Sequence, residues 1–283
     1  MAERSGPWLE IGDRVFTRRY VVFDQQIGVV LGEGEALVVD TRVSHRQGRE
    51  ILDDLRELTT DPVTIVVDTH WHQDHTFGNH VFRPATIWGH ERCGPRMLEL
   101  GERKRRELIE ALPEHAADFA EVVIDPPDRS FSETARVEVG GRRVDLRYLG
   151  RGHTDSDIVV KVPDAGVLFA GDLIEDGATP YFGEGYPLDW PETASRLLEL
   201  VRGPVVPGHG AVRDAGFVED QLTAFLEIAR LGREIHAGRL DLEAAIAISP
   251  FSPETSREPL ERALAQLRGE LDPPGGLDPP TES

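Results

Sequence analysis

Residues 70–75 read His70-Trp71-His72-Gln73-Asp74-His75, and three of the ten histidines of the chain lie within these six positions. Imidazole nitrogens and carboxylate oxygens are the ligands that zinc and its first-row neighbours prefer. A His-x-His-x-Asp-His run can therefore present four metal-binding side chains from one short turn. The alternative is a polar helix start in which the histidines are incidental. We interpret the run as a metal-binding turn.

The segments before this turn predict alternating strands and helices. Residues 63–67 are a nearly continuous apolar run, which is typical of a strand covered on both faces, and the turn follows its end. Residues 36–39 form a shorter apolar run that ends at Asp40. Between these two runs, the apolar residues of 45–58 recur at helical spacing. This strand, helix, strand order favours a layered α/β fold.

Three further candidate ligands follow predicted strands in the second half of the chain. His153 comes after the 144–149 run, Asp172 after Leu168-Phe169-Ala170-Gly171, and His209 after Val205-Val206-Pro207-Gly208. In layered α/β folds, functional side chains gather where strands end and loops converge. We therefore expect these residues to meet the 70–75 turn in space.

The remaining patterns give a coarse map of the chain. A linker is expected at 125–130, and the Pro- and Gly-rich tail 272–283 is expected to be disordered. Further strands are predicted at 15–23, 27–31, 85–88, 136–139, 142–149, 158–162 and 166–170, and helices within 91–121 and at 191–201, 216–238, 241–248 and 257–270.

Composition excludes several classes of protein. The chain has 283 residues, enough for a sizeable core, and its formal net charge of −20 argues against nucleic acid as the partner. No apolar run approaches the ~20 residues of a membrane span. Residues 1–7 lack the basic-then-apolar pattern of a secretory signal, so we expect a cytoplasmic protein. Cys93 is the only cysteine, which excludes an intrachain disulfide and a cysteine-dominated metal site.

The order of these candidate residues resembles the five ordered motifs of the metallo-β-lactamase-fold hydrolase superfamily. In chain order they are Asp40, the 70–75 turn, His153, Asp172 and His209. The resemblance covers roughly residues 10–212. It implies an α/β fold of four layers, an αββα sandwich of two mixed β-sheets flanked by helices, with metals at one edge of the sheets.

The resemblance also implies a division of the candidate ligands between two divalent ions, for which Zn²⁺ is the first expectation and iron or manganese the alternatives. Asp172 would bridge the two ions, and Asp40 would orient the ligand loops. The first ion would be held by His70, His72 and His153, and the second by Asp74, His75 and His209.

The expected reaction is hydrolysis of a small-molecule ester, thioester, lactone or amide by a metal-bridging hydroxide. Asp74 would be the catalytic residue that orients this nucleophile and takes its proton. The chain contains no Gly-x-Ser-x-Gly elbow, so no serine nucleophile is indicated. Two alternatives stay open. One is a mononuclear iron dioxygenase of the persulfide-oxidising type on the same fold, and the other is a non-catalytic metal-binding module.

For domain organisation, we expect residues 1–212 to form the catalytic domain, with a helical insertion at about 91–121. Residues 213–271 should form helices packed on, or extending, that domain. Either helical region is a candidate lid or homodimer surface. The charge run at 102–107 is most simply a solvated helix face.

Overall fold

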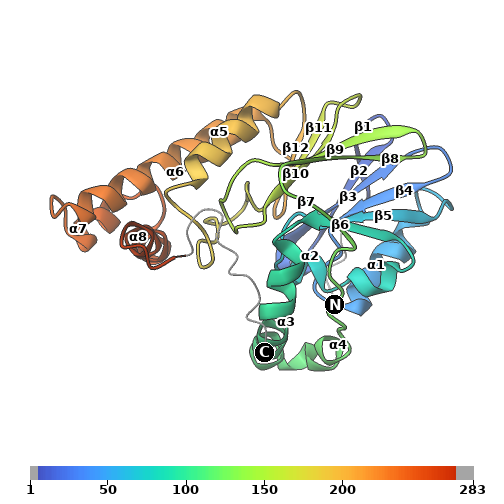
Figure 1. The fold of residues 1–283 in the computed structure, drawn as a ribbon, viewed down its shortest axis with the longest axis horizontal. Coiled ribbons are helices and arrows are strands. Elements are labelled where there is room, and N and C mark those ends of the chain that lie inside the picture. The colour runs from blue at the N-terminus through green and yellow to red at the C-terminus, as the bar shows by residue number, and fades with distance from the viewer. Residues whose placement is uncertain (1–5, 272–283) are drawn as a thin grey trace.

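The structure is a computed structural model that describes residues 6–271, so the tail predicted to be disordered lies outside the described residues. Two mixed β-sheets stack face to face, and helices cover both outer faces (Figure 1). The predicted αββα sandwich is confirmed. Within the described residues, no helix is both long and apolar enough to cross a lipid bilayer.

The first sheet contains the strands of the N-terminal half, in sequence order from β1 to β7. Strands β4, β5 and β6 run parallel, so their carboxyl ends meet at one edge. The strands are β1 (Leu9–Gly12), β2 (Val15–Tyr20), β3 (Gln25–Leu31), β4 (Ala36–Val39), β5 (Val63–Val67), β6 (Thr86–His90) and β7 (Arg129–Phe131).

The second sheet has the order β12-β11-β10-β9-β8. Strand β10 is antiparallel to both β9 and β11, and β11 is parallel to β12. Strands β9, β11 and β12 therefore point the same way and end at one edge. The strands are β8 (Thr134–Val139), β9 (Arg142–Tyr148), β10 (Ile158–Val162), β11 (Val167–Gly171) and β12 (Val205–Pro207).

Apolar side chains from both sheets form the central core. Leu37 and Val67 of the first sheet belong to the same buried cluster as Leu146 and Phe169 of the second. The two sheets approach closely at Gly28, where an added Cβ would lie 2.3 Å from the ring of Phe169. Glycine is required there because the phenyl ring occupies the space of a side chain.

Helices cover the outer faces of the two sheets. Helix α1 (His45–Leu55) packs Ile51 onto the first sheet. Helices α5 (Trp190–Leu200) and α6 (Ala215–His236) cover the second sheet with Trp190 and Phe225. Ser44 caps the N-terminus of α1 and Asp214 caps that of α6, and each side chain accepts a hydrogen bond from a backbone N–H of the first turn.

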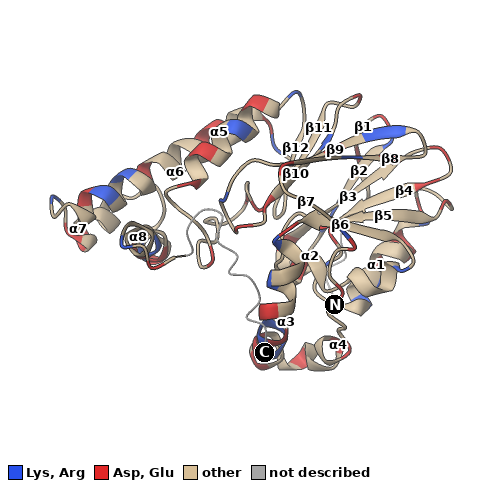
Figure 2. Cartoon of the chain, in the orientation of Figure 1, with Lys and Arg blue, Asp and Glu red and all other residues tan. Residues whose placement is uncertain are grey.

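Two further groups of helices lie beside this sandwich. Helices α3 (Cys93–Ala111) and α4 (Ala116–Ala120) follow β6, while α7 (Leu242–Ala247) and α8 (Pro253–Leu267) pack against α6. Both basic and acidic residues mark α3 and α6 (Figure 2). Most charges of α3 are exposed, as predicted, but Lys104 is largely buried.

Several predicted boundaries were wrong. The 15–23 strand ends at Tyr20, because Phe23 has a φ of +63° and the chain turns there. The 125–130 linker contains the start of the edge strand β7, and β1 was not predicted. Helix α8 begins at Pro253 rather than at residue 257, since proline is well suited to the first turn of a helix.

Candidate metal centre

The 70–75 turn continues directly from β5. His72 has extended backbone angles and precedes the one-turn helix α2 (Gln73–Thr76). Thr76 donates from its hydroxyl to the carbonyl of His72 at 2.9 Å, which closes this short helix on itself. His70 and His72 belong to one group of candidate ligands, and Asp74 and His75 belong to the other.

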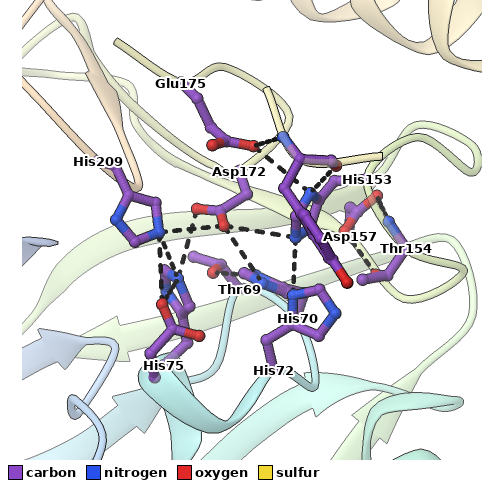
Figure 3. A network of polar contacts seen from close by, with 12 residues as sticks. Thr69, His70, His72, His75, His153, Thr154, Asp157, Asp172, Glu175 and His209 are labelled. Carbon is purple, nitrogen blue, oxygen red and sulfur yellow. Dashed lines mark hydrogen bonds and ion pairs between the residues drawn. The ribbon is translucent and has the colours of Figure 1, made fainter. Parts of the chain in front are cut away.

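The structure brings all seven predicted ligands together, in two groups at the shared edge of the sheets. Figure 3 labels each of them except Asp74. The ligand atoms of each group lie within 4.8 Å of one another. The first group is His70, His72, His153 and Asp172, and the second is Asp74, His75 and His209.

Asp172 connects the two groups. Its carboxylate lies 3.6 Å from Nε2 of His70 and 3.4 Å from Nε2 of His153 in the first group. The same carboxylate lies 3.4 Å from Nε2 of His75 and 3.2 Å from Nε2 of His209 in the second. A side chain in this position can contribute to both groups.

Three of the histidines are anchored through Nδ1. His153 Nδ1 lies 3.0 Å from the carbonyl of Tyr181, and His209 Nδ1 lies 2.6 Å from the carbonyl of Phe23. A carbonyl only accepts hydrogen bonds, so each Nδ1 carries a proton, and each Nε2 faces the centre, where it can give a lone pair to a metal once its own proton is lost. His75 has the same arrangement, with Nδ1 2.8 Å from a carboxylate oxygen of Asp40. Such outer partners are typical of histidines that bind metals.

Asp40 also organises the start of the turn. Its carboxylate accepts from the backbone N–H of Thr69 at 2.8 Å and from the Thr69 hydroxyl at 2.9 Å. The hydroxyl oxygen then lies 3.1 Å from Nδ1 of His70, which can donate to it. Asp40 therefore orients both His70 and His75, the role that the sequence predicted for it.

Buried polar atoms test whether the residues fit a bound cation. His70 Nε2 and Asp172 Oδ1 are both buried, and neither has a hydrogen-bond partner within residues 6–271. A buried polar atom without a partner costs about 1–3 kcal/mol. Both atoms face the centre of the cluster, where a divalent cation would satisfy them, so the donor set fits a metal.

The electrostatics of the cluster agree with this interpretation. Burial alone would raise the pKa of Asp172, but His209 and the other histidines outweigh it and hold that pKa well below its usual range. Burial lowers the pKa of His153 to about 3, with His72 adding to the effect. Burial also lowers the pKa of His209, but Asp172 outweighs it and raises that pKa to about 10. The centre thus contains ionised carboxylates that attract positive charge.

A pocket of about 380 Å³ opens onto both groups. Phe23 and Tyr181 supply aromatic surface, and Lys104 and Glu184 supply a charged pair in which Nζ and Oε1 are 2.7 Å apart. This pair was not predicted from the sequence. The rarity of lysine was the available signal, because Lys104 is one of only two lysines in the chain.

Glu175 is a further pocket residue that the sequence did not single out. Its carboxylate lies 3.5 Å from Nδ1 of His153 and accepts from the backbone N–H of Tyr181 at 3.0 Å. Burial raises the pKa of Glu175 to about 8, with Asp172 adding to the effect. The signal available was its position three residues after Asp172.

Helix α8 holds the loop at 177–189 that forms one wall of the pocket. Gln266 accepts from the backbone N–H of Leu188 at 2.9 Å, and Arg262 donates to the carbonyl of Gly185 at 2.8 Å. The C-terminal helices thus contact the loop that carries Tyr181 and Glu184.

Two further side chains of metal-binding type, His80 and Cys93, lie outside the two groups. His80 pairs with Asp125 at 3.1 Å and stacks on His45, outside both groups. Cys93 is buried, and burial raises the pKa of its thiol. Four aromatic side chains close in sequence to the candidate ligands are buried in apolar clusters: Trp71, Phe77, Phe182 and Trp190.

Two residues near the turn also have structural partners. Asp68 accepts from the side-chain amide of Asn79 at 2.8 Å. The hydroxyl of Thr154 donates to Asp157 at 2.6 Å, and the same carboxylate accepts from the Thr154 backbone N–H at 2.8 Å. These bonds fix the two loops that carry His70 and His153.

Comparison of the sequence with known proteins gives consistent matches. A metallo-β-lactamase type 2 from Bacteroides fragilis is 24% identical over 188 residues, covering 64% of this chain and 67% of that protein. A linear primary-alkylsulfatase from Pseudomonas sp. (strain ATCC 19151) is 23% identical over 208 residues, covering 62% of this chain and 39% of that protein.

Solved structures share the fold. A metallo-β-lactamase from Pontibacter korlensis superposes with a TM-score of 0.65 at 20% identity, over 79% of this chain and 99% of that one. A stereoselective inverting sec-alkylsulfatase from Pseudomonas sp. superposes with a TM-score of 0.74 at 15% identity, over 96% of this chain and 52% of that one. The sequence model of the metallo-beta-lactamase superfamily matches residues 21–235, and the chain belongs to this superfamily.

Proposed function

We propose that this protein is a metal-dependent hydrolase with two divalent cations, most simply Zn²⁺, that cleaves a carbonyl-type ester, thioester, lactone or amide. The observation that carries the proposal is the arrangement of ring nitrogens. His75, His153 and His209 are anchored through Nδ1 and turn Nε2 toward the carboxylate of Asp172. Inward lone pairs around a shared carboxylate are what a binuclear metal centre needs.

One ion would be held by His70, His72 and His153, and the other would be held by Asp74, His75 and His209. Asp172 would contribute to both sites. When bound, the two ions would supply a hydroxide nucleophile at neutral pH and Lewis acidity toward the reacting carbonyl.

Asp74 is suited to guide the proton of the attacking water. Its carboxylate lines the pocket and lies 3.4 Å from Nε2 of both His75 and His209. Burial raises the pKa of Asp74, but His75 and His209 outweigh it and hold that pKa below its usual range. An ionised Asp74 can accept a hydrogen bond from the nucleophile and orient it.

The pocket favours a small substrate with an apolar portion. Its volume of about 380 Å³ is near the lower end of ordinary small-molecule sites. Phe23 and Tyr181 can contact an apolar group while the reacting carbonyl faces the metal groups.

The test combines metal analysis with a substrate panel. We expect about two equivalents of zinc per chain and turnover of at least one ester, thioester, lactone or amide. In H72A and D172A we expect lower bound zinc and loss of turnover, because each removes a ligand. Unchanged metal content in both variants would refute the assignment, and one iron per chain with oxygen consumption would favour the dioxygenase alternative.

A sulfate ester is the second candidate substrate. The alkylsulfatase structure matches 96% of this chain, whereas the metallo-β-lactamase from Pontibacter korlensis matches 79%. The panel therefore includes a primary and a secondary alkyl sulfate. Release of sulfate without turnover of any carbonyl substrate would favour this candidate.

A further inference from the structure

His72 is oriented differently from the other clustered histidines. His70, His75, His153 and His209 all turn Nε2 toward Asp172. His72 turns Nδ1 inward, 2.7 Å from Nε2 of His153, so its Nε2 points out of the cluster (Figure 3). If His72 binds a metal through Nδ1, then Nε2 must carry the proton.

The outward nitrogen of His72 faces a carboxylate. Oε2 of Glu184 lies 3.6 Å from Nε2 of His72. Both atoms are buried, and neither has a hydrogen-bond partner within the described residues. The separation exceeds hydrogen-bond length by a few tenths of an ångström, which a small rotation of the Glu184 side chain closes. The two unsatisfied atoms thus complement each other as donor and acceptor.

The other oxygen of Glu184 is held from helix α3. Nζ of Lys104 lies 2.7 Å from Oε1, and the side chains of Lys104 and Glu184 are only 13% and 22% exposed. A charge pair with so little exposure is screened less than a surface pair. Lys104 also reaches toward the exposed Glu107, at 3.8 Å, which is a weaker contact. The carboxylate of Glu184 therefore lies between Lys104 and His72, and Tyr181 is a further polar neighbour of it.

The anchored histidines show what this arrangement does. His75 donates from its outward nitrogen to Asp40, and His153 and His209 donate to backbone carbonyls. Glu184 stands in the equivalent position for His72. An outer carboxylate fixes the tautomer and orientation of a metal-binding histidine and makes the ring a stronger ligand.

We propose that Glu184 is a positioning residue for His72: it accepts a hydrogen bond from Nε2–H, keeps Nδ1 free for the first metal ion, and is itself held by Lys104. This inference rests on the proposed metal centre. It gives α3 and the 177–189 loop a direct role in metal affinity. It also explains why one of the two lysines of the chain lies beside the pocket.

The test measures zinc affinity by competition with a chromophoric chelator, with turnover not required. We expect E184A to lower the zinc affinity of the first site, which contains His72, by about 10–100-fold. This range is typical for loss of a residue that holds a metal-binding histidine from outside. E184Q retains an acceptor oxygen and should lose less than E184A. E107Q is the matched control, since it removes the exposed neighbour of Lys104, and should match the wild type.

Two further measurements separate positioning from general damage. K104M should weaken zinc binding in the wild-type background. It should cause no further loss in E184A, because Lys104 acts on His72 only by holding Glu184. Long-range ¹H–¹⁵N spectra of the zinc-loaded protein should show a zinc-bound imidazole protonated at Nε2, and this signal should change in E184A. Unchanged affinity in both E184A and E184Q, or a first site without an Nε2-protonated ring, would overturn the inference.

Failure of this inference differs from failure of the proposed function. A wild-type protein that binds no metal refutes the metal centre itself. If the wild-type protein binds two zinc ions and both E184A and E184Q bind zinc with the same affinity as the wild type, only the role of Glu184 is refuted.

Discussion

Asp40 holds His75 from outside the metal centre, with its carboxylate 2.8 Å from Nδ1 of the ring. The same carboxylate accepts from the backbone N–H and the hydroxyl of Thr69. Three donors therefore converge on one buried side chain. Its backbone has a φ of +65°, so the loop is bent sharply to bring the carboxylate there.

Replacing Asp40 with asparagine should weaken zinc binding by about 10–100-fold. Asparagine has one acceptor oxygen, so its NH₂ group would face one of the donors from Thr69 or His75. Chelator competition measures the loss. D53N, on the exposed side of α1, is the control and should bind zinc like the wild type. Equal affinity in D40N would show that Asp40 does not orient the ligands.

Gly208 should not tolerate a side chain. An added Cβ would lie 1.8 Å from Oδ1 of Asp172, which must then move away from both groups of ligands. We expect G208A to bind less zinc and to lose turnover even where the fold is retained. The control is G216A at the start of α6, where the nearest atom to an added Cβ is 3.4 Å away. Wild-type zinc content in G208A would contradict this prediction.

Removal of metal should lower the free energy of unfolding. A ligand present at 100 times its dissociation constant stabilises the folded state by about 2.7 kcal/mol. We therefore expect added zinc to raise the midpoint of urea unfolding and a chelator to lower it. In H72A the same additions should shift the midpoint less. A midpoint that is independent of zinc in the wild type would argue against binding to the folded state.

His90 should make stability depend on pH in the acid range. Burial lowers the pKa of His90 to about 4, although its bond to the carbonyl of Ser132 raises it and Arg92 lowers it further. The unfolded chain takes up a proton near the ordinary pKa of about 6.5, while the folded protein does not. Stability is therefore fully present above pH 6.5 and is lost as the pH falls from 6.5 toward 4, by at most about 3 kcal/mol.

Urea unfolding of the metal-free protein at pH 7 and pH 5 checks the contribution of His90. H90Q can keep the hydrogen bond to Ser132 but cannot titrate, so the difference between the two pH values should shrink. H236Q, at the exposed end of α6, should leave the difference as it is in the wild type. An equal difference in H90Q and the wild type would exclude His90 as the source.

The resemblance of the ordered motifs to a known superfamily predicted the four-layer fold, and the predicted strand ends indicated where the candidate ligands lie. Asp40, His153, Asp172 and His209 each follow a strand, and the carboxyl ends of the relevant strands lie at one edge in both sheets. Strand direction follows from the alternation of apolar runs and turns, so residues far apart in sequence could be expected to meet.

The Lys104–Glu184 pair could not be predicted in the same way. Lys104 lies within a charged helical run, where most charged side chains are solvated, and Glu184 lies in an irregular loop without periodicity. Their contact depends on how α3 and the 177–189 loop are placed relative to the turn. The strand β7 was missed for a related reason, because three residues at a sheet edge give too short a pattern.

The metal-binding turn comes from the first sheet, whereas His153, Asp172 and His209 come from the second. Metal–ligand bonds at this edge would cross-link the two sheets. A disulfide cannot do this, because the chain has a single cysteine. Loss of the ions would remove these cross-links at the edge of the sheets, while the apolar core between the sheets would stay packed. Local unfolding of the metal-free protein would then begin with separation of the two sheets at the edge that carries the ligands.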